Sequence, residues 1–550
     1  MTAPRASATL RGMATSDSDG TRGWIAPVAT MGSVALLTFG GLFIFDHFVT
    51  GGPGGGGATD PLARYLRFDQ DHITDAVSAL GAMTAGVLGI VITVVSLLVQ
   101  LSAGRYAGVA RMFVRDRINI GVMGYYVVAC SFGVLVSLSI QADFVPRTTV
   151  LAMVLATMLA LLLMAPYFAY VFSFLEPANI TARVREEALD AFESGAGAAA
   201  PELVDRTQAR VLQSLEELTD IVANSIEGKD KIIASGAVDA IKDFTVTYLA
   251  RKASTPPRWF DFGEQIRLNP DVVALDPEAR DELVARRTWV EWKAMRQFLG
   301  LYSEALATMP DINHLIAIDT RYIAEAATEQ RDEEAILLTL RYMNSYLRAT
   351  LNARNVRTAF NVLNQYRQLV LGLMKAGRGS LAFAAMQHLR YYGHVSYDMK
   401  LPFVTETVAY DMGALCEAAH ELGLAEEDAL LDEFLELDRA TKGRAEEQSL
   451  KGVRKAQIKL AAYLLSVDDR ERARRIYHDM EADPDERLLG IRDELMRVET
   501  KDFWEIIDRG RNFDYLPPDQ KAAMQRFFAW FRGVDSAAHS PDEARVGEDA

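Results

Sequence analysis

The stretch VQLSAGRYAGVARMFVRDRI, residues 99–118, joins two long apolar runs and decides the fold class. Its first residues end one apolar run, and the chain becomes apolar again after Ile118. Between the runs lie four arginines and a single acidic residue, Asp116. A helix needs about 20 apolar residues to cross a hydrocarbon core. The stretch therefore predicts a basic turn between two membrane-spanning helices.

Four apolar runs of sufficient length lie in the first 175 residues. They cover residues 24–47, 76–101, 118–140 and 148–175. Long uncharged runs repeated so closely are typical of membrane spans and unusual in soluble helices. We therefore expect an all-α protein with a four-helix transmembrane domain at residues 23–176. Residues 1–22, which are polar and rich in Ser and Thr, predict a disordered tail.

Charge divides the chain into two unlike parts. Residues 1–175 hold ten Arg, nine Asp and no Lys or Glu, whereas all lysines lie at or beyond Lys229. Residues 176–550 hold 48 basic and 65 acidic residues, a formal charge of −17. This predicts an acidic soluble domain after the spans. Such a charge argues against nucleic-acid binding, which needs concentrated positive charge.

The arginines beside the spans predict the orientation. The N-terminal tail, the three connecting loops and the segment after the last span hold three, two, four, one and two of them in chain order. Cytoplasmic loops carry the excess of Lys and Arg. This alternation predicts that both termini and the 105–117 loop lie in the cytoplasm.

One face of the second predicted span carries small and polar residues. At 100° per residue they fall in a stripe roughly 100° wide. The stripe consists of Ala82, Ala85, Gly86, Gly89, Thr93, Ser96 and Gln100. Small residues let helices approach closely, so helix packing is one interpretation. The other is that Thr93, Ser96 and Gln100 line a water-filled pore.

The loop after this span has two candidate roles. Arg105, Arg111, Arg115 and Arg117 are expected to anchor the inner membrane surface and to contact lipid headgroups. Asp116, a lone acid among them, predicts a tertiary partner, for which residues 183–187 are the nearest candidates. The loop would then also clamp the spans to the soluble domain.

The segment LGIVITVVSLLVQLSAGRYAGVARMFVRDRINIGVMG, residues 88–124, carries a further pattern. A span dotted with Ser and Thr ends in Gln100-Leu101-Ser102, an aromatic residue follows at Tyr106, and Phe113-Val114-Arg115-Asp116-Arg117 comes next. In these features the chain resembles the predicted membrane proteins of domain-of-unknown-function family 2254 (DUF2254).

The resemblance covers about residues 75–185. It departs from the family pattern at Ala107-Gly108-Val109, where members carry Ser-Pro-Arg. It implies a bacterial inner-membrane protein, and it implies no particular chemistry.

Residues 177–534 predict a large helical cytoplasmic domain. Helical periodicity recurs throughout, with breaks at Pro- and Gly-containing turns. No clean 34-residue recurrence exists, so a bundle and a repeat-like stack both remain open. Residues 253–280 are expected to form an ordered loop that divides the domain, or to face the membrane through Trp259 and Phe260. The acidic tail, residues 535–550, is expected to be disordered.

Motifs that carry chemistry are absent from the sequence. It contains no HExxH, GxSxG or GxxxxGK[ST] pattern, and its two cysteines, Cys130 and Cys416, form no CxxC pair. We therefore predict no catalytic residue, no metal site and no cofactor, and hence not an enzyme.

Three functions fit these patterns. The first is a membrane-anchored interaction or sensing protein, homo-oligomeric in the lipid bilayer, whose helical domain binds a protein partner. The alternative is an oligomeric channel lined by the second span, and a membrane-associated enzyme is a remote third.

Overall fold

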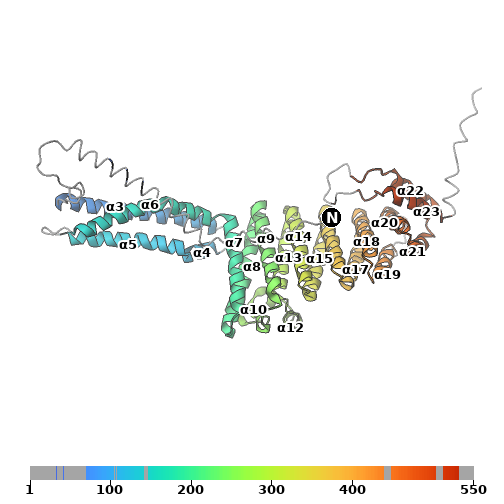
Figure 1. The fold of residues 1–550 in the computed structure, drawn as a ribbon, viewed down its shortest axis with the longest axis horizontal. Helices are drawn as coiled ribbons and strands as arrows, with labels where there is room; N and C mark the ends of the chain where they lie inside the picture. The colour runs from blue at the N-terminus through green and yellow to red at the C-terminus, as the bar shows by residue number, and fades with distance from the viewer. Residues whose placement is uncertain are drawn as a thin grey trace, which may run out of the picture. The chain divides into compact units, whose positions relative to one another are not determined.

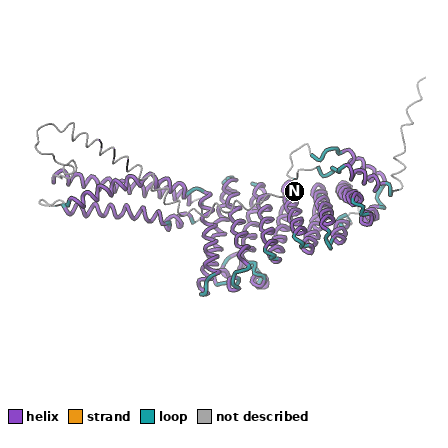
Figure 2. The backbone as a smooth tube through the Cα atoms, in the orientation of Figure 1, coloured by secondary structure: helices purple, strands orange, loops and turns teal. Residues whose placement is uncertain are grey.

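The computed structural model describes residues 70–103, 106, 108–140, 146–438, 447–502, 509 and 512–531, besides three isolated positions before residue 70. The predicted tails at residues 1–22 and 535–550 lie outside this part, as does the predicted span at 24–47 apart from those three positions. The described residues form helices and contain no strand, which confirms the all-α prediction (Figures 1 and 2).

The chain folds as two compact units, residues 1–180 and 181–550. We call the helices of the first unit the membrane bundle and those of the second the helical stack. Helix α7 (Pro177–Ala196) begins in the first unit and ends in the second.

The described residues of the membrane bundle before α7 form one short and three long helices. They are α3 (Gln70–Ala103), α4 (Val109–Arg115), α5 (Arg117–Ser139) and α6 (Arg147–Phe174), and the three long ones pack against one another. Three segments are long and apolar enough to cross a membrane: His72–Ser102, Arg117–Ser139 and Thr148–Phe174. They coincide with the second, third and fourth predicted spans, and the first, at residues 24–47, lies outside the described residues apart from the three isolated positions.

Valines and tyrosines make the centre of the bundle. Val91 of α3 packs with Tyr126 of α5 and Tyr167 of α6, all fully buried. The Tyr126 hydroxyl donates a hydrogen bond to the Ala160 carbonyl at 2.7 Å. Such partners matter because a buried polar group in lipid has no water to bond.

The helical stack consists mainly of helices of about 20 residues. Apart from α7 and the short helices of residues 253–288, its described helices are α8 (Pro201–Glu227), α9 (Lys231–Lys252), α13 (Trp289–Thr308), α14 (Pro310–Glu329), α15 (Glu333–Asn352), α16 (Val356–Lys375), α17 (Gly379–Asp398), α18 (Pro402–Leu422), α19 (Glu427–Leu435), α20 (Glu447–Ser466), α21 (Arg470–Met480), α22 (Asp485–Arg497) and α23 (Pro518–Phe528).

These helices form two rows of packed neighbours. One row runs through α8, α13, α15, α17 and α19, and the other through α9, α14, α16, α18, α20 and α23 (Figure 1). Helices α14, α16 and α18 begin at Pro310, Val356 and Pro402, each 46 residues after the last. The unit is therefore a repeat-like stack of antiparallel hairpins in this region, with a spacing longer than 34 residues.

Tight turns with a left-handed residue join many of these helices. Lys229, Arg331 and Arg354 have φ of 57°, 59° and 53°. After Arg331, the Asp332 N–H donates to the Ala327 carbonyl, which closes the α14 end as a Schellman motif. The Asp332 side chain then caps α15. Such turns are short because the residue that closes one helix is followed directly by the residue that caps the next.

Residues 253–288 form an ordered excursion between α9 and α13. It contains η2 (Pro257–Trp259), α10 (Glu264–Leu268), α11 (Pro270–Val273) and α12 (Pro277–Ala285). Trp259 and Phe260 are 0% and 2% exposed, so the expectation that these rings face a membrane is wrong. Trp259 instead packs edge-on against Phe192 and lies beside Trp289. Large aromatic rings gain more from this buried apolar contact than from a position at the surface of the stack.

Buried ion pairs tie the excursion and its flanks to the stack. Lys252 of α9 donates to Glu291 of α13 at 2.5 Å and to Asp332 at 2.6 Å. Lys293, which is 1% exposed, donates to Glu216 at 2.7 Å and to Asp271 at 2.6 Å. Buried charges require such partners, and each lysine joins elements that are distant in sequence.

Candidate functional site

The small and polar stripe of the second predicted span lies on α3 and is exposed along its whole length. Its residues are Ala82, Ala85, Gly86, Gly89, Thr93, Ser96 and Gln100. The face of α3 that packs on α5 and α6 is a different one, with Val87, Val91 and Val95 at its centre. Within the described chain the stripe is therefore unused for packing, and its role toward another molecule stays a prediction.

Two arginines of the basic loop, Arg111 and Arg115, lie on α4, and a third, Arg117, is the first residue of α5. Arg111, Arg115 and Arg117 are exposed, and Arg105 lies outside the described residues. Gly108, which stands where the family pattern differs, has φ of 82°, a left-handed conformation that suits glycine.

Asp116 caps a helix, and the tertiary partner predicted for it among residues 183–187 stays a prediction. Its carboxylate accepts a hydrogen bond from the Asn119 N–H at 2.9 Å and caps the N-terminus of α5. Asn119 in turn accepts from the Tyr167 hydroxyl of α6 at 2.7 Å and donates to the Phe113 carbonyl of α4 at 3.0 Å. Asp116 therefore starts a network that fixes the corner of the bundle. An aspartate just before an apolar helix is an N-cap signal that the sequence already contained.

A polar groove on the helical stack is the most developed site in the described residues. It lies on α16, α18 and α20, and Arg367, Tyr410, Asp411 and Lys459 line it. Beside the small residues Gly413, Ala414 and Ala456 it contains a cavity of about 390 Å³.

Residues 512–516, here called the returning segment, lie on this groove between α22 and α23. The Phe513 ring stacks on the Tyr410 ring, with centroids 4.8 Å apart and planes 14° apart. Lys459 donates hydrogen bonds to the backbone carbonyls of Phe513 and Tyr515. The groove thus holds both a side chain and the backbone of the segment.

A carboxylate of the returning segment is also recognised. Asp514 accepts a hydrogen bond from the Tyr410 hydroxyl and another from Lys455 at 2.9 Å. Lys455 also pairs with Glu494 at 3.0 Å. Burial favours the neutral amine, but these two carboxylates outweigh it and raise the pKa of Lys455. The lysine is therefore a fixed positive charge in the groove.

Arg509 enters the groove from the chain just before the returning segment. It donates to the Asp411 carboxylate and to the Phe360 carbonyl, the latter at 2.9 Å. Its guanidinium lies 4.3 Å from the Phe360 ring centroid and 5.5 Å from that of Phe513. Arg367 approaches the same Asp411 carboxylate at 3.3 Å.

Two polar atoms of this contact have no hydrogen-bond partner among the described residues. They are Oδ2 of Asp411 and Nε of Arg509, whose side chains are 2% and 4% exposed. Burial raises the pKa of Asp411, although both arginines oppose the shift. The ion pair is thus buried but incompletely bonded, which costs free energy.

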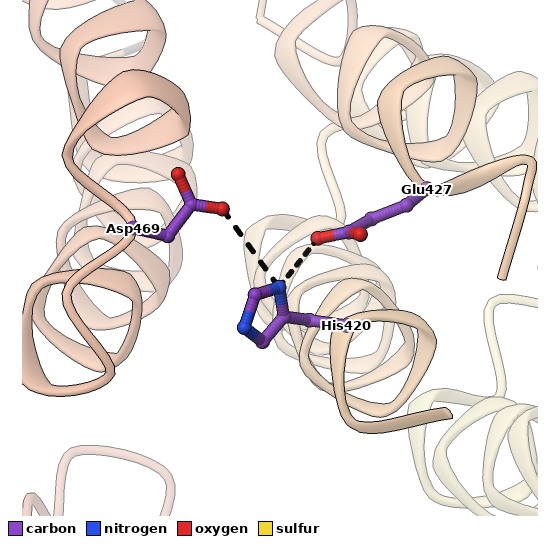
Figure 3. Close-up of side chains that lie close together, drawn as sticks. All are labelled: His420, Glu427 and Asp469. Carbon is purple, nitrogen blue, oxygen red and sulfur yellow. Dashed lines mark hydrogen bonds and ion pairs between the residues drawn. The ribbon is translucent and has the colours of Figure 1, made fainter. Parts of the chain in front are cut away.

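A second cluster joins α18, α19 and α21. Nδ1 of His420 lies 2.6 Å from Glu427 and 3.8 Å from Asp469 (Figure 3). Ligand atoms of these three residues lie within 4.8 Å of one another, as a metal site requires. However, Arg472 pairs with Glu427 at 3.2 Å and with Asp469 at 2.7 Å. A divalent cation would lie beside this guanidinium, so the geometry favours an ion-pair junction over a metal site.

The groove residues were not anticipated from the sequence. Lys451, Lys455 and Lys459 are spaced four apart and so share one face of α20, which is a visible signal. Their acceptors lie on the returning segment and on α22, and no local pattern connects those elements to α20.

Comparison with known proteins bears on the first part of the chain. Residues 21–254 match the family DUF2254, described as predicted membrane protein. The resemblance predicted for residues 75–185 is confirmed. The DUF2254 match ends just beyond α9, so the groove lies outside it.

No curated protein matches the chain. One solved structure is described as "Circular tandem repeat protein with novel repeat topology and enhanced subunit contact surfaces". It aligns over 68% of this chain and 87% of its own at 14% identity, with a TM-score of 0.28. A score this low does not establish a shared fold.

Proposed function

We propose that this protein is a membrane-anchored interaction protein whose helical stack binds a partner protein. The observation that carries the proposal is the groove on α16, α18 and α20, which holds a turn of the chain through a lysine, a stacked tyrosine and a buried aspartate. Surfaces of stacked helical hairpins commonly bind peptides and proteins.

The membrane bundle serves as the anchor in this proposal. We infer from the arginine distribution that the protein lies in a bacterial inner membrane with both termini and the stack in the cytoplasm. The partner would then be a cytoplasmic protein or the cytoplasmic part of another membrane protein. No catalytic role is assigned to the groove.

Photo-crosslinking in native membranes tests the proposal. A photoreactive amino acid at Ala414, which is exposed and lines the groove cavity, is expected to capture a partner. The same residue at Ser303, exposed on α13 in the other row, is the matched control. Equal capture from both positions, or none from Ala414 in any growth condition, would contradict the proposal.

We propose, as a second candidate, that copies of the chain associate through α3. The exposed stripe favours this, because small residues allow close approach between helices in lipid and Thr93, Ser96 and Gln100 can bond across or line a pore. Cysteine at Gly89 is expected to form intermolecular disulfides, whereas cysteine at Val91, buried in the bundle, is not. Solute flux through liposomes then separates a channel from a packed oligomer.

A further inference from the structure

We propose that the groove on α16, α18 and α20 is a peptide-binding site that Arg509 and residues 512–515 of the same chain occupy as an internal competitor. The partner segment has the form Arg-x-x-x-Phe-Asp, as in Arg509 to Asp514. This inference rests on the proposed interaction function and names the class of partner.

Each feature of the internal segment is recognised by its own groove residue. Asp411 holds the Arg509 guanidinium, Tyr410 stacks on the ring of Phe513, and Lys459 binds two backbone carbonyls. Backbone bonds supply affinity whatever the sequence, and side-chain contacts supply specificity. The spacing between the guanidinium and the ring therefore defines the motif that the groove selects.

The internal segment fits the groove incompletely. A cavity of about 390 Å³ remains beside it, lined by Asp411 and Arg509 among others. Oδ2 of Asp411 and Nε of Arg509 lack partners among the described residues, although both side chains are buried. Arg509 belongs to the segment, so only Oδ2 of Asp411 remains for a competing ligand, and a ligand that bonds this atom would bind better than the internal segment does.

The helices that form the groove pack directly on one another, although Arg509, Asn512 and Phe513 supply part of its lining. Helix α18 has its own buried face, which includes Val408, Met412 and Leu415, and α18 packs directly on α16 and α20. Weakening the segment should therefore leave these three helices packed together, with the groove residues that they carry in place.

The segment is also held close to the groove. It is followed at once by α23, which begins at Pro518 and packs on α20. A tethered ligand has an effective concentration in the millimolar range, so it competes strongly even when its own contacts are modest. An external peptide should bind weakly until the segment is weakened or removed.

A synthetic fluorescent peptide of residues 507–517 is the probe, and its anisotropy is measured with full-length protein in detergent. The double variant Phe513→Ala/Asp514→Asn is expected to bind it about tenfold or more tighter than the unmodified chain does. Adding Lys459→Ala to the double variant should abolish binding. Adding Lys451→Ala is the matched control, because Lys451 lies on the same helix face but pairs with Glu494.

Three results would overturn the inference. The first is a double variant that keeps the unfolding midpoint of the unmodified chain and yet does not bind the peptide. The second is binding that Lys459→Ala and Lys451→Ala affect equally. The third is a concentration-dependent dimer that the unmodified chain forms and the double variant does not. In that case the segment of one copy would occupy the groove of another copy. If crosslinking from Ala414 still captures a partner in the first two cases, the proposed function stands and only the peptide motif fails.

Discussion

The membrane bundle and the helical stack are both all-helical, yet different forces specify them. In the bundle, the exposed faces are as apolar as the buried ones: Ile90 and Leu97 of α3 are 55% and 56% exposed, whereas Val91 is fully buried. In the stack, the exposed surface is highly charged and the interior contains Trp259, Trp289 and Phe244. Hydropathy therefore distinguishes inside from outside only in the stack, because lipid is as apolar as a helix interface.

Polar groups differ between the two units in the same way. Buried hydroxyls of the bundle bond to neutral groups: Tyr126 donates to the Ala160 carbonyl and Tyr167 donates to the Asn119 side chain, each at 2.7 Å. The stack buries complete ion pairs such as Lys252 with Glu291. A charge at the centre of a bilayer is costly, whereas a soluble fold tolerates it once it is paired.

The largest effect is expected from removing one of these buried charges. Lys252→Met should lower the free energy of unfolding by about 3–5 kcal/mol, because Glu291 and Asp332 lose their shared cation. Urea unfolding followed by tryptophan fluorescence reports on this unit, since five of the six tryptophans lie beyond residue 180.

The matched control for that change is Lys231→Met. Lys231 pairs with Asp311, but the two side chains are 59% and 60% exposed. A loss below about 1 kcal/mol is expected there. Similar losses from both variants would show that burial of the pair is not what stabilises the stack.

Replacing a glycine by alanine should destabilise the helical stack more than the membrane bundle. A Cβ at Gly195 of α7 would overlap Thr207 and Trp259, so Gly195→Ala should cost about 1–3 kcal/mol. In α3, a Cβ at Gly86 meets nothing within 4 Å, and Gly86→Ala should be neutral or slightly stabilising. Thermal unfolding in detergent compares the two, and a large loss for Gly86→Ala would instead reveal a packed stripe.

Asp319 of α14 makes the stack sensitive to pH. Burial raises its pKa to about 8, because Lys242 at 3.9 Å is too distant to hydrogen-bond it and Asp239 and Asp243 add to the shift. The unfolded carboxyl ionises near 3.8 while the folded one stays protonated, so this group's contribution to stability falls as pH rises from about 4 to 8.

Replacing Asp319 by Asn should remove this dependence. The stability difference between Asp319→Asn and the unmodified chain should shift in favour of the variant by up to about 1.4 kcal/mol per pH unit in that window. Urea midpoints at pH 5 and pH 8 measure it. A difference that is the same at both pH values would mean that Asp319 is ionised in the folded protein.

The last comparison concerns paired hydroxyls, and a small loss is expected for the pair in the bundle. Thr84 and Thr157 bond across α3 and α6 at 3.1 Å, and Thr84→Val should cost about 0.6 kcal/mol, a typical value for bundles in membranes. Thr350 and Tyr302 form a similar pair in the stack at 2.5 Å, where Thr350→Val should cost about 1–3 kcal/mol because the tyrosine hydroxyl stays buried. Unfolding in mixed micelles and in urea, respectively, measures the two losses.

The sequence by itself determined the helical class, three described spans and the basic turn at residues 99–118. These follow from chain length, hydropathy and charge, which act locally. It also contained the cap at Asp116, an aspartate at the start of an apolar helix, whereas the tertiary partner predicted for this residue stays a prediction. Local signals of this kind can be recognised without knowing the fold.

Only the tertiary structure decided which surfaces meet. It buried Trp259 and Phe260 and turned the valine face of α3 inward. It left the small and polar stripe of the same helix exposed. It also brought Arg509 and Phe513 onto α16, α18 and α20, across separations of about 50 to 150 residues. The physical reason is that such contacts depend on how the rows of helices stack. Helical periodicity predicts which face of a helix is buried, but it does not predict which other helix or segment that face will contact.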